Sequence, residues 1–301
     1  MTRRVLITGA GGFVGSHLAQ GFAAMGDLVI GVDQAFDGVT SWRLIGVELI
    51  ERDMLATAGD LPAADLVIHG AAITTPLQAG GAGEDRLLGA NIALLQASLR
   101  HAVDCGASDF VFISSSGVFA PEDGDGIHLE STVPTATLPY AQAKRAGEEA
   151  LAKVGSLRAI SIRLGPIYGP HERPRQTRTV VSPVRRWLDM ALSGEPIIVE
   201  MPEERRDWTF APDLAGALDA LLHRQPPASG AFHLTSGQIF SNGEVARMIA
   251  GLVPGANVAV AEVKRTPRLP MSSNRLDLSE LYGWTPMPQG LAQMLDAEGR
   301  A

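Results

Sequence analysis

A strand–turn–helix pattern with three evenly spaced glycines near the N-terminus constrains the fold more than any other feature of this chain. Residues 4–8, Arg-Val-Leu-Ile-Thr, predict a short strand, and Gly9, Gly12 and Gly15 follow it directly. Apolar residues then recur every three or four positions between Val14 and Met25, which is the spacing of a helix with one buried side. A strand that turns through glycines into a helix is typical of a parallel α/β sheet.

The same turn has the chemistry of a dinucleotide-binding site. The first glycine permits a tight turn, the second lets the backbone approach a pyrophosphate, and the third lets the helix pack on the strand. The helix N-terminus offers free N–H groups and the positive end of its dipole to the phosphates. We therefore expect dinucleotide contacts from five residues of this segment: Gly9, Gly12, Phe13, Val14 and Gly15.

Acidic residues after the next two predicted strands indicate which dinucleotide is bound. The apolar segment 27–33 ends in Asp33, 18 residues after Gly15. A carboxylate there accepts hydrogen bonds from both ribose hydroxyls and repels a 2′-phosphate, which favours NAD over NADP. Asp53 and Met54 follow another apolar run and could lie beside the adenine, although a solvated loop acid fits that position equally well.

Strands and helices alternate through the first half of the chain. Further strands are predicted at 65–69, 110–113 and 160–164, and a long helix at 85–104. This alternation implies a parallel sheet with right-handed crossovers, whose ligands bind outside the carboxyl ends of the strands. Two more segments end such strands: the small residues Gly70, Ala71 and Ala72, which would let the nicotinamide half approach, and the serines 114–116.

Tyr140 and Lys144 lie four residues apart in Leu-Pro-Tyr-Ala-Gln-Ala-Lys. On a helix this spacing puts both side chains on one face, with Cβ atoms about 5–6 Å apart. A fixed ammonium stabilises a phenolate and lowers the pKa of a tyrosine from its ordinary value of about 10. The pair is therefore a candidate proton-transfer device, although the spacing alone also occurs on ordinary amphipathic helices.

Composition limits the class of protein. The 301 residues suit one doubly wound domain with a smaller lobe, and 46% hydrophobic with 19% charged residues describes an ordinary globular chain. A net charge of −8 argues against nucleic-acid binding. The single cysteine, Cys105, fits a reducing compartment such as the cytoplasm, and neither a metal-ligand cluster nor a membrane-spanning apolar run is visible.

After residue 165 the sequence becomes richer in proline and arginine. Residues 180–193 and the segment after Pro212 predict helices, and Ser241 with Glu244 forms a capping box that predicts a helix to about Leu252. We expect this half to form a substrate-binding lobe. Its arginines, at 173, 175, 178 and 206, are either substrate contacts or ordinary surface charge.

Together these motifs resemble the extended short-chain dehydrogenases/reductases, the NAD-dependent epimerase/dehydratase group. The resemblance runs through nearly the whole chain and is carried by Thr8–Gly15, Asp33, His69–Ala72, Asn91, Ser114–Ser116, Tyr140 with Lys144, Arg163–Pro170, Arg206–Asp213 and Leu281–Pro286.

The resemblance implies a Rossmann-type doubly wound parallel sheet with a smaller C-terminal lobe. Residues 1–165 would form the NAD-binding domain, with 207–236 returning to it, and 166–206 with 237–301 would form the substrate lobe. It also implies that Asn91 lies in the cofactor site, and that the chain forms a homodimer through helices at about 85–104 and 140–153.

The implied chemistry is hydride transfer. Tyr140 would take the proton of a secondary alcohol while the hydride moves to the nicotinamide, and Lys144 would stabilise the phenolate and bind the ribose. Counting back three residues from Val118, which matches the valine of the family's Val-Tyr-Gly tract, selects Ser115 as the hydroxyl that orients the substrate. Ser116 beside it is a candidate substrate contact and the alternative catalytic serine.

Departures from the family pattern narrow the choice of substrate. Ser116 and Gly117 stand where 4,6-dehydratases have acidic residues, which argues against dehydration. Pro166 stands where nucleotide-sugar enzymes commonly have an asparagine that contacts the diphosphate. Arg173 and Arg206 remain as candidate substrate contacts, and an anionic carbohydrate such as a sugar acid fits such a pocket.

Three hypotheses remain. The first is an NAD-dependent dehydrogenase of a carbohydrate-type substrate. The second is a nucleotide-sugar 4-epimerase, in which the keto intermediate is reduced again from its other face. The third is a non-catalytic dinucleotide sensor, which the intact Tyr140 and Lys144 pair argues against.

Overall fold

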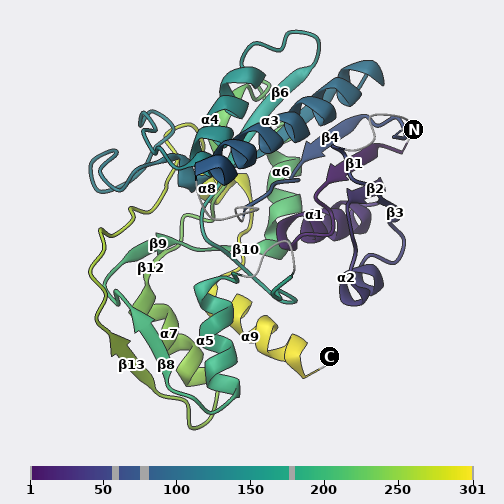
Figure 1. Cartoon of the computed structure of the whole chain (residues 1–301). Helices are drawn as coiled ribbons and strands as arrows, with labels where there is room; N and C mark the ends of the chain where they lie inside the picture. The colour runs from purple at the N-terminus through teal and green to yellow at the C-terminus, as the bar shows by residue number, and fades with distance from the viewer. Residues whose placement is uncertain (1, 56–60, 75–80, 176–179, 300–301) are drawn as a thin grey trace. The chain divides into compact units, whose positions relative to one another are not determined.

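A computed structural model describes residues 2–55, 61–74, 81–175 and 180–299 of the chain (Figure 1). These residues form two compact units. The first comprises the chain up to Val118, Ala136–Leu164 and Leu214–Leu234, and the second comprises Phe119–Thr135, Gly165–Asp213 and the chain from Thr235 onward. Both units are thus assembled from three separate segments of sequence.

The first unit is built on a seven-stranded sheet with the order β11-β6-β5-β4-β1-β2-β3. All neighbouring strands are parallel. The order reverses between β1 and β4, which is the point where open α/β sheets bind their ligands. The strands are β1 (Arg4–Thr8), β2 (Leu28–Asp33), β3 (Glu48–Glu51), β4 (Leu66–His69), β5 (Asp109–Ser115), β6 (Arg158–Leu164) and β11 (Gly230–His233).

Helices cover this sheet in two packed pairs. Helix α1 (Phe13–Ala24) packs on α6 (Leu214–His223), and α3 (Gly81–Asp104) packs on α4 (Pro139–Leu151) (Figure 1). The short α2 (Gly38–Arg43) follows β2. Since helices lie over the sheet, the central strands are buried; Val5, Leu6 and Ile7 have no exposed surface. The predicted Rossmann-type sheet is confirmed.

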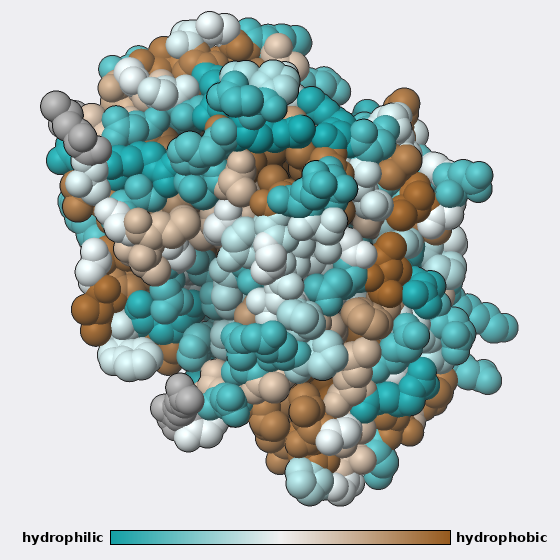
Figure 2. Space-filling model, turned by 180° about the vertical axis from the view of Figure 1, so that it is seen from behind, coloured by the Kyte–Doolittle hydropathy of each residue, from teal (hydrophilic) through white to brown (hydrophobic). Residues whose placement is uncertain are grey.

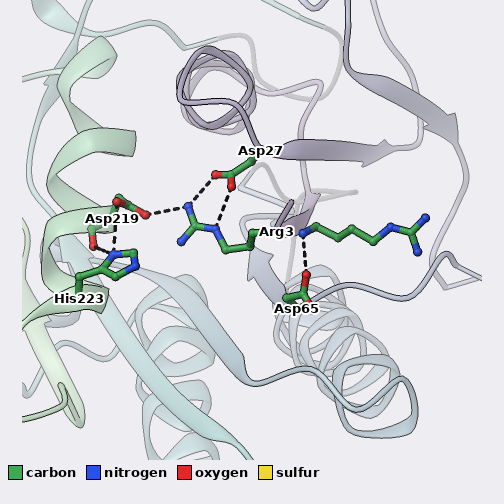
Figure 3. Close-up of polar contacts among 6 residues, drawn as sticks. Arg3, Asp27, Asp65, Asp219 and His223 are labelled. Carbon is green, nitrogen blue, oxygen red and sulfur yellow. Dashed lines mark hydrogen bonds and ion pairs between the residues drawn. The ribbon is translucent and has the colours of Figure 1, made fainter. Parts of the chain in front are cut away.

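An ion-pair network ties α6 to the start of the sheet, although the two lie far apart in the sequence (Figure 3). Arg3 donates to both carboxylate oxygens of Asp27, at 3.0 and 2.6 Å, and lies 2.7 Å from the carboxylate of Asp219 on α6. His223 caps the same helix through the Asp219 carbonyl. These contacts raise the pKa of Arg3, with the Asp27 hydrogen bond as the largest cause.

The second unit contains short sheets and four helices in its described part. Its core packs two tryptophans, Trp187 and Trp208, with Tyr168 and Phe210. Its elements are β7 (Ile167–Tyr168), α5 (Pro183–Leu192), β8 (Ile197–Glu200), β9 (Arg205–Asp207), β10 (Thr209–Phe210), β12 (Ile239–Ser241), α7 (Asn242–Leu252), β13 (Val258–Ala261), α8 (Leu278–Leu281) and α9 (Met287–Glu298).

The capping box predicted for α7 is present in both directions. The Ser241 hydroxyl accepts the Glu244 N–H, and the Glu244 carboxylate accepts the Ser241 N–H. The predicted helix at 180–193 is α5, which begins after the N-cap residue Ser182. The division of the chain into an NAD-binding domain and a substrate lobe is a statement about function and stays a prediction.

The face seen in Figure 2 mixes hydrophobic and hydrophilic side chains. Figure 2 shows one face, on which hydrophobic side chains lie in small patches between hydrophilic ones. Exposed apolar side chains include Trp42, Ile45 and Val133, and such single exposures are common in globular proteins. Within the described ranges, every helix is too short or too polar to cross a membrane.

Candidate active site

The glycine turn is packed so tightly that side chains would not fit. Gly9 has a positive φ of 75°, and a Cβ there would lie 2.6 Å from the Ala71 nitrogen. A Cβ on Gly15 would lie 2.1 Å from the carbonyl oxygen of Gly9. Gly12 is the N-cap of α1, and its N–H donates to the Gly9 oxygen at 3.0 Å. Phe13 and Val14 form the first turn of α1, where backbone N–H groups lack intrahelical acceptors.

Asp33 lies at the carboxyl end of β2 and is held by the glycine turn. Its Oδ2 accepts the N–H of Gly11 at 2.9 Å, and its Oδ1 accepts the N–H of Gln34 at 2.7 Å. A Cβ on Gly11 would lie 2.8 Å from Oδ2. Sequence reasoning passed over Gly11 because it lies between the spaced glycines, although the Gly11-Gly12 pair was a visible signal.

The loop after β4 joins this turn and is fixed by Asn91. Gly70 donates to the Thr8 carbonyl at 3.0 Å, and Ala71 donates to the Thr8 hydroxyl at 3.4 Å. The Asn91 amide both accepts the Ile73 N–H and donates to the Ile73 carbonyl, at 2.9 and 3.0 Å. Asn91 therefore positions the loop that contains Ala72, and its direct contact with the cofactor stays a prediction.

Asp53 and Met54, expected beside the adenine, differ in their surroundings. Asp53 is exposed and accepts the Leu55 N–H at 2.8 Å. Met54 is half-buried and packs on the core cluster beneath the sheet. The local hydrogen bond explains the Asp53 conformation without a ligand, and its role stays a prediction.

Lys144 is buried in the structure although it carries a charged group. It is 5% exposed, and its Nζ donates to the Ile113 carbonyl of β5 at 2.7 Å. Nζ lies 5.5 Å from the ring centroid of Tyr140 and 4.7 Å from that of Phe112. The helix α4 thus presents Lys144 and Tyr140 on one face, as the spacing predicted.

Ser115 and Tyr140 both lie next to Gly117. A Cβ on Gly117 would lie 3.2 Å from the Ser115 Oγ and 3.8 Å from the Tyr140 Cε1. The Ser115 Oγ accepts the Gly117 N–H at 3.0 Å. Ser116 begins the short helical turn that follows β5. The structure therefore brings Ser115, Tyr140 and Lys144 together at the carboxyl end of β5.

Burial lowers the pKa of Lys144 to about 8, and the carboxylate of Glu148 partly offsets this by raising the same pKa. Glu148 itself accepts two hydrogen bonds from Arg163, at 2.9 and 2.6 Å, and one from the Ser114 hydroxyl at 2.6 Å. The lysine therefore remains mostly protonated at neutral pH. Sequence reasoning missed the Glu148–Arg163 ion pair, although Glu148 continues the four-residue spacing of Tyr140 and Lys144.

His69 lies buried beside this centre and stays neutral. Burial, with a smaller contribution from the Lys144 charge, lowers its pKa to about 3. Its Nδ1 lies 2.9 Å from the Thr8 hydroxyl and 2.8 Å from the Ser98 hydroxyl. A neutral, hydrogen-bonded imidazole supports the strand ends without adding charge to them.

The predicted substrate residues Arg173 and Arg206 belong to the second unit. Arg173 is exposed. Arg206 lies on β9 and is mostly buried, and burial lowers its pKa. Its Nε has no hydrogen-bond partner among the described residues. Arg178 lies outside the described residues. In the part of the chain that the structure covers, no group of acidic, His or Cys side chains could hold a metal ion.

A family model for the NAD dependent epimerase/dehydratase family matches residues 5–233. The chain belongs to this family. It is therefore an NAD-dependent enzyme of the epimerase/dehydratase type, and NAD is its cofactor. The glycine turn and Asp33, described above, lie within the matched region.

Several known members of the family are similar to this chain. A protein of Bacillus subtilis described as the uncharacterized UDP-glucose epimerase YtcB is 27% identical over 73% of this chain and 72% of its own length. The UDP-glucose 4-epimerase of Mycolicibacterium smegmatis is 26% identical over 97% of both chains. The structure of MoeE5 in complex with UDP-glucose and NAD matches with a TM-score of 0.76 at 25% identity, over 99% of both chains.

Proposed function

We propose that this enzyme oxidises a secondary alcohol of a carbohydrate-type substrate, with Tyr140 as the catalytic base and NAD as the hydride acceptor. The observation that carries the proposal is the buried Lys144 ammonium, fixed on the Ile113 carbonyl and 5.5 Å from the Tyr140 ring. A fixed positive charge at this distance stabilises the phenolate form of the tyrosine.

Tyr140, Ser115 and Lys144 would each have a separate role in the reaction. Tyr140 removes the hydroxyl proton of the substrate, and Ser115 donates a hydrogen bond to the oxygen that becomes a carbonyl. Lys144 keeps the phenolate charged and, as its position in the family pattern implies, binds the ribose. General-base catalysis of this kind contributes about 10²- to 10⁴-fold to the rate.

The residues around the glycine turn fit NAD. Gly9, Gly12 and Gly15 leave the turn without side chains, so that a pyrophosphate can approach the first turn of α1. The Asp33 carboxylate lies at the end of β2. There it would accept hydrogen bonds from the ribose hydroxyls of NAD and would repel the 2′-phosphate of NADP. We assign the predicted contacts of Phe13, Val14 and the 70–72 loop to the same cofactor.

A nucleotide-sugar 4-epimerase is the second candidate, and the comparisons favour it. Two of the similar proteins are described as UDP-glucose epimerases, and MoeE5 was solved with UDP-glucose. Tyr140 would then take the proton of the substrate hydroxyl during oxidation and return it when the keto intermediate is reduced from its other face. Pro166, which has no side-chain amide for a diphosphate, favours the sugar-acid alternative.

The test uses wild type and Tyr140→Phe with a panel of sugars, sugar acids and UDP-sugars, followed by nicotinamide absorbance and by product analysis. We expect turnover on one class, and a loss of about 10²–10⁴ in kcat in the variant with NAD affinity retained. Tyr282→Phe is the matched control, since Tyr282 belongs to the second unit and packs on Trp284. Unchanged turnover in Tyr140→Phe would disprove the proposal.

The two candidates separate in the same assay. A dehydrogenase accumulates reduced nicotinamide with its substrate, whereas an epimerase converts its substrate with no net change in absorbance. A protein that binds NAD but converts no compound of the panel would instead support a dinucleotide sensor.

We further propose a cytoplasmic homodimer that associates through α3 and α4. The single cysteine and the family resemblance support this assignment. Light scattering on the purified protein measures the mass directly, and a mass of 31.8 kDa, that of one chain, would contradict it. Cell fractionation tests the location.

A further inference from the structure

Glu148 lies one helical turn beyond Lys144 and points its carboxylate toward the sheet. It continues the row of Tyr140 and Lys144 along α4, and its side chain is only 12% exposed. Helix α4 packs on β5 and β6 and on α3 (Figure 1). Charged side chains are seldom this deeply buried unless they are paired. The partners of this carboxylate therefore decide what it contributes to the centre.

The carboxylate of Glu148 ties the carboxyl ends of β5 and β6 to α4. Its Oε1 accepts the Ser114 hydroxyl at 2.6 Å and the Nε of Arg163 at 2.9 Å, and its Oε2 accepts the Nη2 of Arg163 at 2.6 Å. Ser114 and Arg163 are partners in the register of the two strands, and Ser114 directly precedes Ser115. These hydrogen bonds therefore fix the strand end that carries Ser115 against α4.

Several elements bring titratable groups to the region around Lys144. They are Tyr140 and Glu148 on α4, His69 on β4, Arg163 on β6 and His233 on β11, whose ring lies 3.4 Å from Arg163. Helix α3 contributes the uncharged Ser98, which contacts His69. Burial lowers the pKa of His69 to about 3, so that this ring is neutral. Among these groups, Glu148 is the one that raises the pKa of Lys144 against the effect of burial.

Position along the helix decides which protonation state the carboxylate favours. Glu148 lies four residues from Lys144 and eight from Tyr140, which are rises of about 6 Å and about 12 Å along an α-helix. Because Coulomb interactions weaken with distance, the negative charge stabilises the ammonium more than it destabilises the phenolate. When the pair has lost one proton, the carboxylate therefore favours charged Lys144 beside ionised Tyr140.

We propose that Glu148 is a positioning residue for the reaction: anchored by Arg163, its carboxylate keeps the proton on Lys144 and thereby favours the phenolate of Tyr140. Glu148 acts through Lys144 rather than on the substrate. Its hydrogen bond to Ser114 holds the end of β5 in the same arrangement. The inference rests on the proposed function, in which Tyr140 is the base.

A titration of tyrosine absorbance tests this role without substrate. The chain has three tyrosines, and burial raises the pKa of the other two, Tyr168 and Tyr282. As the pH rises, the first tyrosinate in the ultraviolet spectrum of the NAD-loaded protein should therefore be that of Tyr140. Its loss in Tyr140→Phe would assign it. The main comparison is between Glu148→Gln, which keeps the shape but loses the charge, and Glu148→Asp, which keeps the charge.

Three further variants separate charge from packing. Glu149→Gln is the matched control, because Glu149 is the exposed neighbour on the same helix. Ser114→Ala removes one hydrogen bond of the network but no charge. The double variant Glu148→Met with Arg163→Met removes both charges and leaves neither buried alone, a replacement that buried ion pairs often tolerate. It keeps the test decisive if Glu148→Gln does not fold.

We expect the Tyr140 step to move to higher pH by about one unit in Glu148→Gln, and in the same direction in the double variant. Glu148→Asp, Ser114→Ala and Glu149→Gln should stay close to the wild-type midpoint. The pH profile of kcat for oxidation should shift with the step, so that kcat below the midpoint falls about 10-fold while KM changes little. A loss of packing alone would instead lower kcat at every pH and leave the midpoint in place.

The proposal is overturned if Glu148→Gln and the double variant, folded by circular dichroism, titrate with the wild-type midpoint. It is also overturned if the first tyrosinate step persists in Tyr140→Phe. Failure of the proposed function has a different signature. In that case Tyr140→Phe leaves turnover unchanged, whereas the spectroscopic midpoint of Tyr140 still depends on the charge of Glu148.

Discussion

The polar groups around Lys144 in the first unit and around Asp207 in the second are held in different ways. In the first unit, Lys144, Asn91 and Glu148 have protein partners within 3.0 Å. In the second, the Oδ2 of Asp207 and the Nε of Arg206 have none among the described residues. A satisfied group is held in one position, whereas an unsatisfied one is not fixed by a hydrogen bond.

This difference affects both rigidity and stability. Proton transfer needs a base and its partner charge fixed to within a fraction of an ångström, which internal hydrogen bonds supply. A buried polar atom without a partner instead costs about 1–3 kcal/mol. The centre around Lys144 therefore gains rigidity from its polar groups, whereas the unpaired atoms near Asp207 reduce the stability of the fold.

The largest expected effect comes from breaking a satisfied network. Glu148→Ala leaves Arg163 buried without its carboxylate, and the loss of one partner of a buried ion pair costs about 3–5 kcal/mol. Urea unfolding should show this loss. It should also show almost no change for Glu149→Ala, the exposed neighbour on the same helix. Equal stability of the two variants would contradict the distinction between the units.

A smaller effect should come from Asp207 in the second unit. Burial raises its pKa from 3.8 to about 6, so the folded state binds this proton more tightly than the unfolded state does. The resulting stabilisation is present below about pH 4 and is lost as the pH rises through 6. Asp207→Asn cannot ionise and should avoid this loss, which is on the order of 2–3 kcal/mol.

Unfolding free energies at pH 4 and pH 7 measure this difference. The decline between the two pH values should be smaller in Asp207→Asn than in wild type. The exposed Asp125→Asn, in the same unit, should keep the wild-type decline. Parallel pH curves for wild type and Asp207→Asn would show that the buried carboxylate is already satisfied.

The smallest effect on stability is expected from close packing around a glycine rather than from a buried polar group. Gly15→Ala places a Cβ 2.1 Å from the Gly9 carbonyl and should destabilise the fold by about 1–3 kcal/mol and weaken NAD binding. Gly89→Ala adds a Cβ on α3 with no atom within 4 Å and should stabilise the protein by about 0.5–1 kcal/mol. Thermal unfolding distinguishes the two signs, and a gain in Gly15→Ala would refute the tight-turn interpretation.

Local patterns predicted much of this structure. The parallel sheet followed from alternating apolar strands and amphipathic helices, and the capping box of α7 from two residues three positions apart. Tyr140 and Lys144 were predicted on one helical face because helix geometry fixes neighbours four residues apart. Such features depend on spacings that a sequence displays directly.

Contacts between distant segments could not be predicted in the same way. The Glu148–Arg163 pair joins α4 to β6, and His128 joins the 270–272 segment through a backbone bridge. Their partners are set by register and crossover geometry, which one sequence does not encode in any short pattern. His128 also lies in no recognisable sequence motif.

The interleaving of the two units has a practical consequence. The chain passes from one unit to the other at five boundaries, after Val118, Thr135, Leu164, Asp213 and Leu234. Neither unit corresponds to an uninterrupted stretch of the gene, so expression of a truncated half would leave core strands or helices unpartnered. A protease cut at any single boundary would leave the other four passages between the units intact, so one cut would not release either unit as a separate fragment.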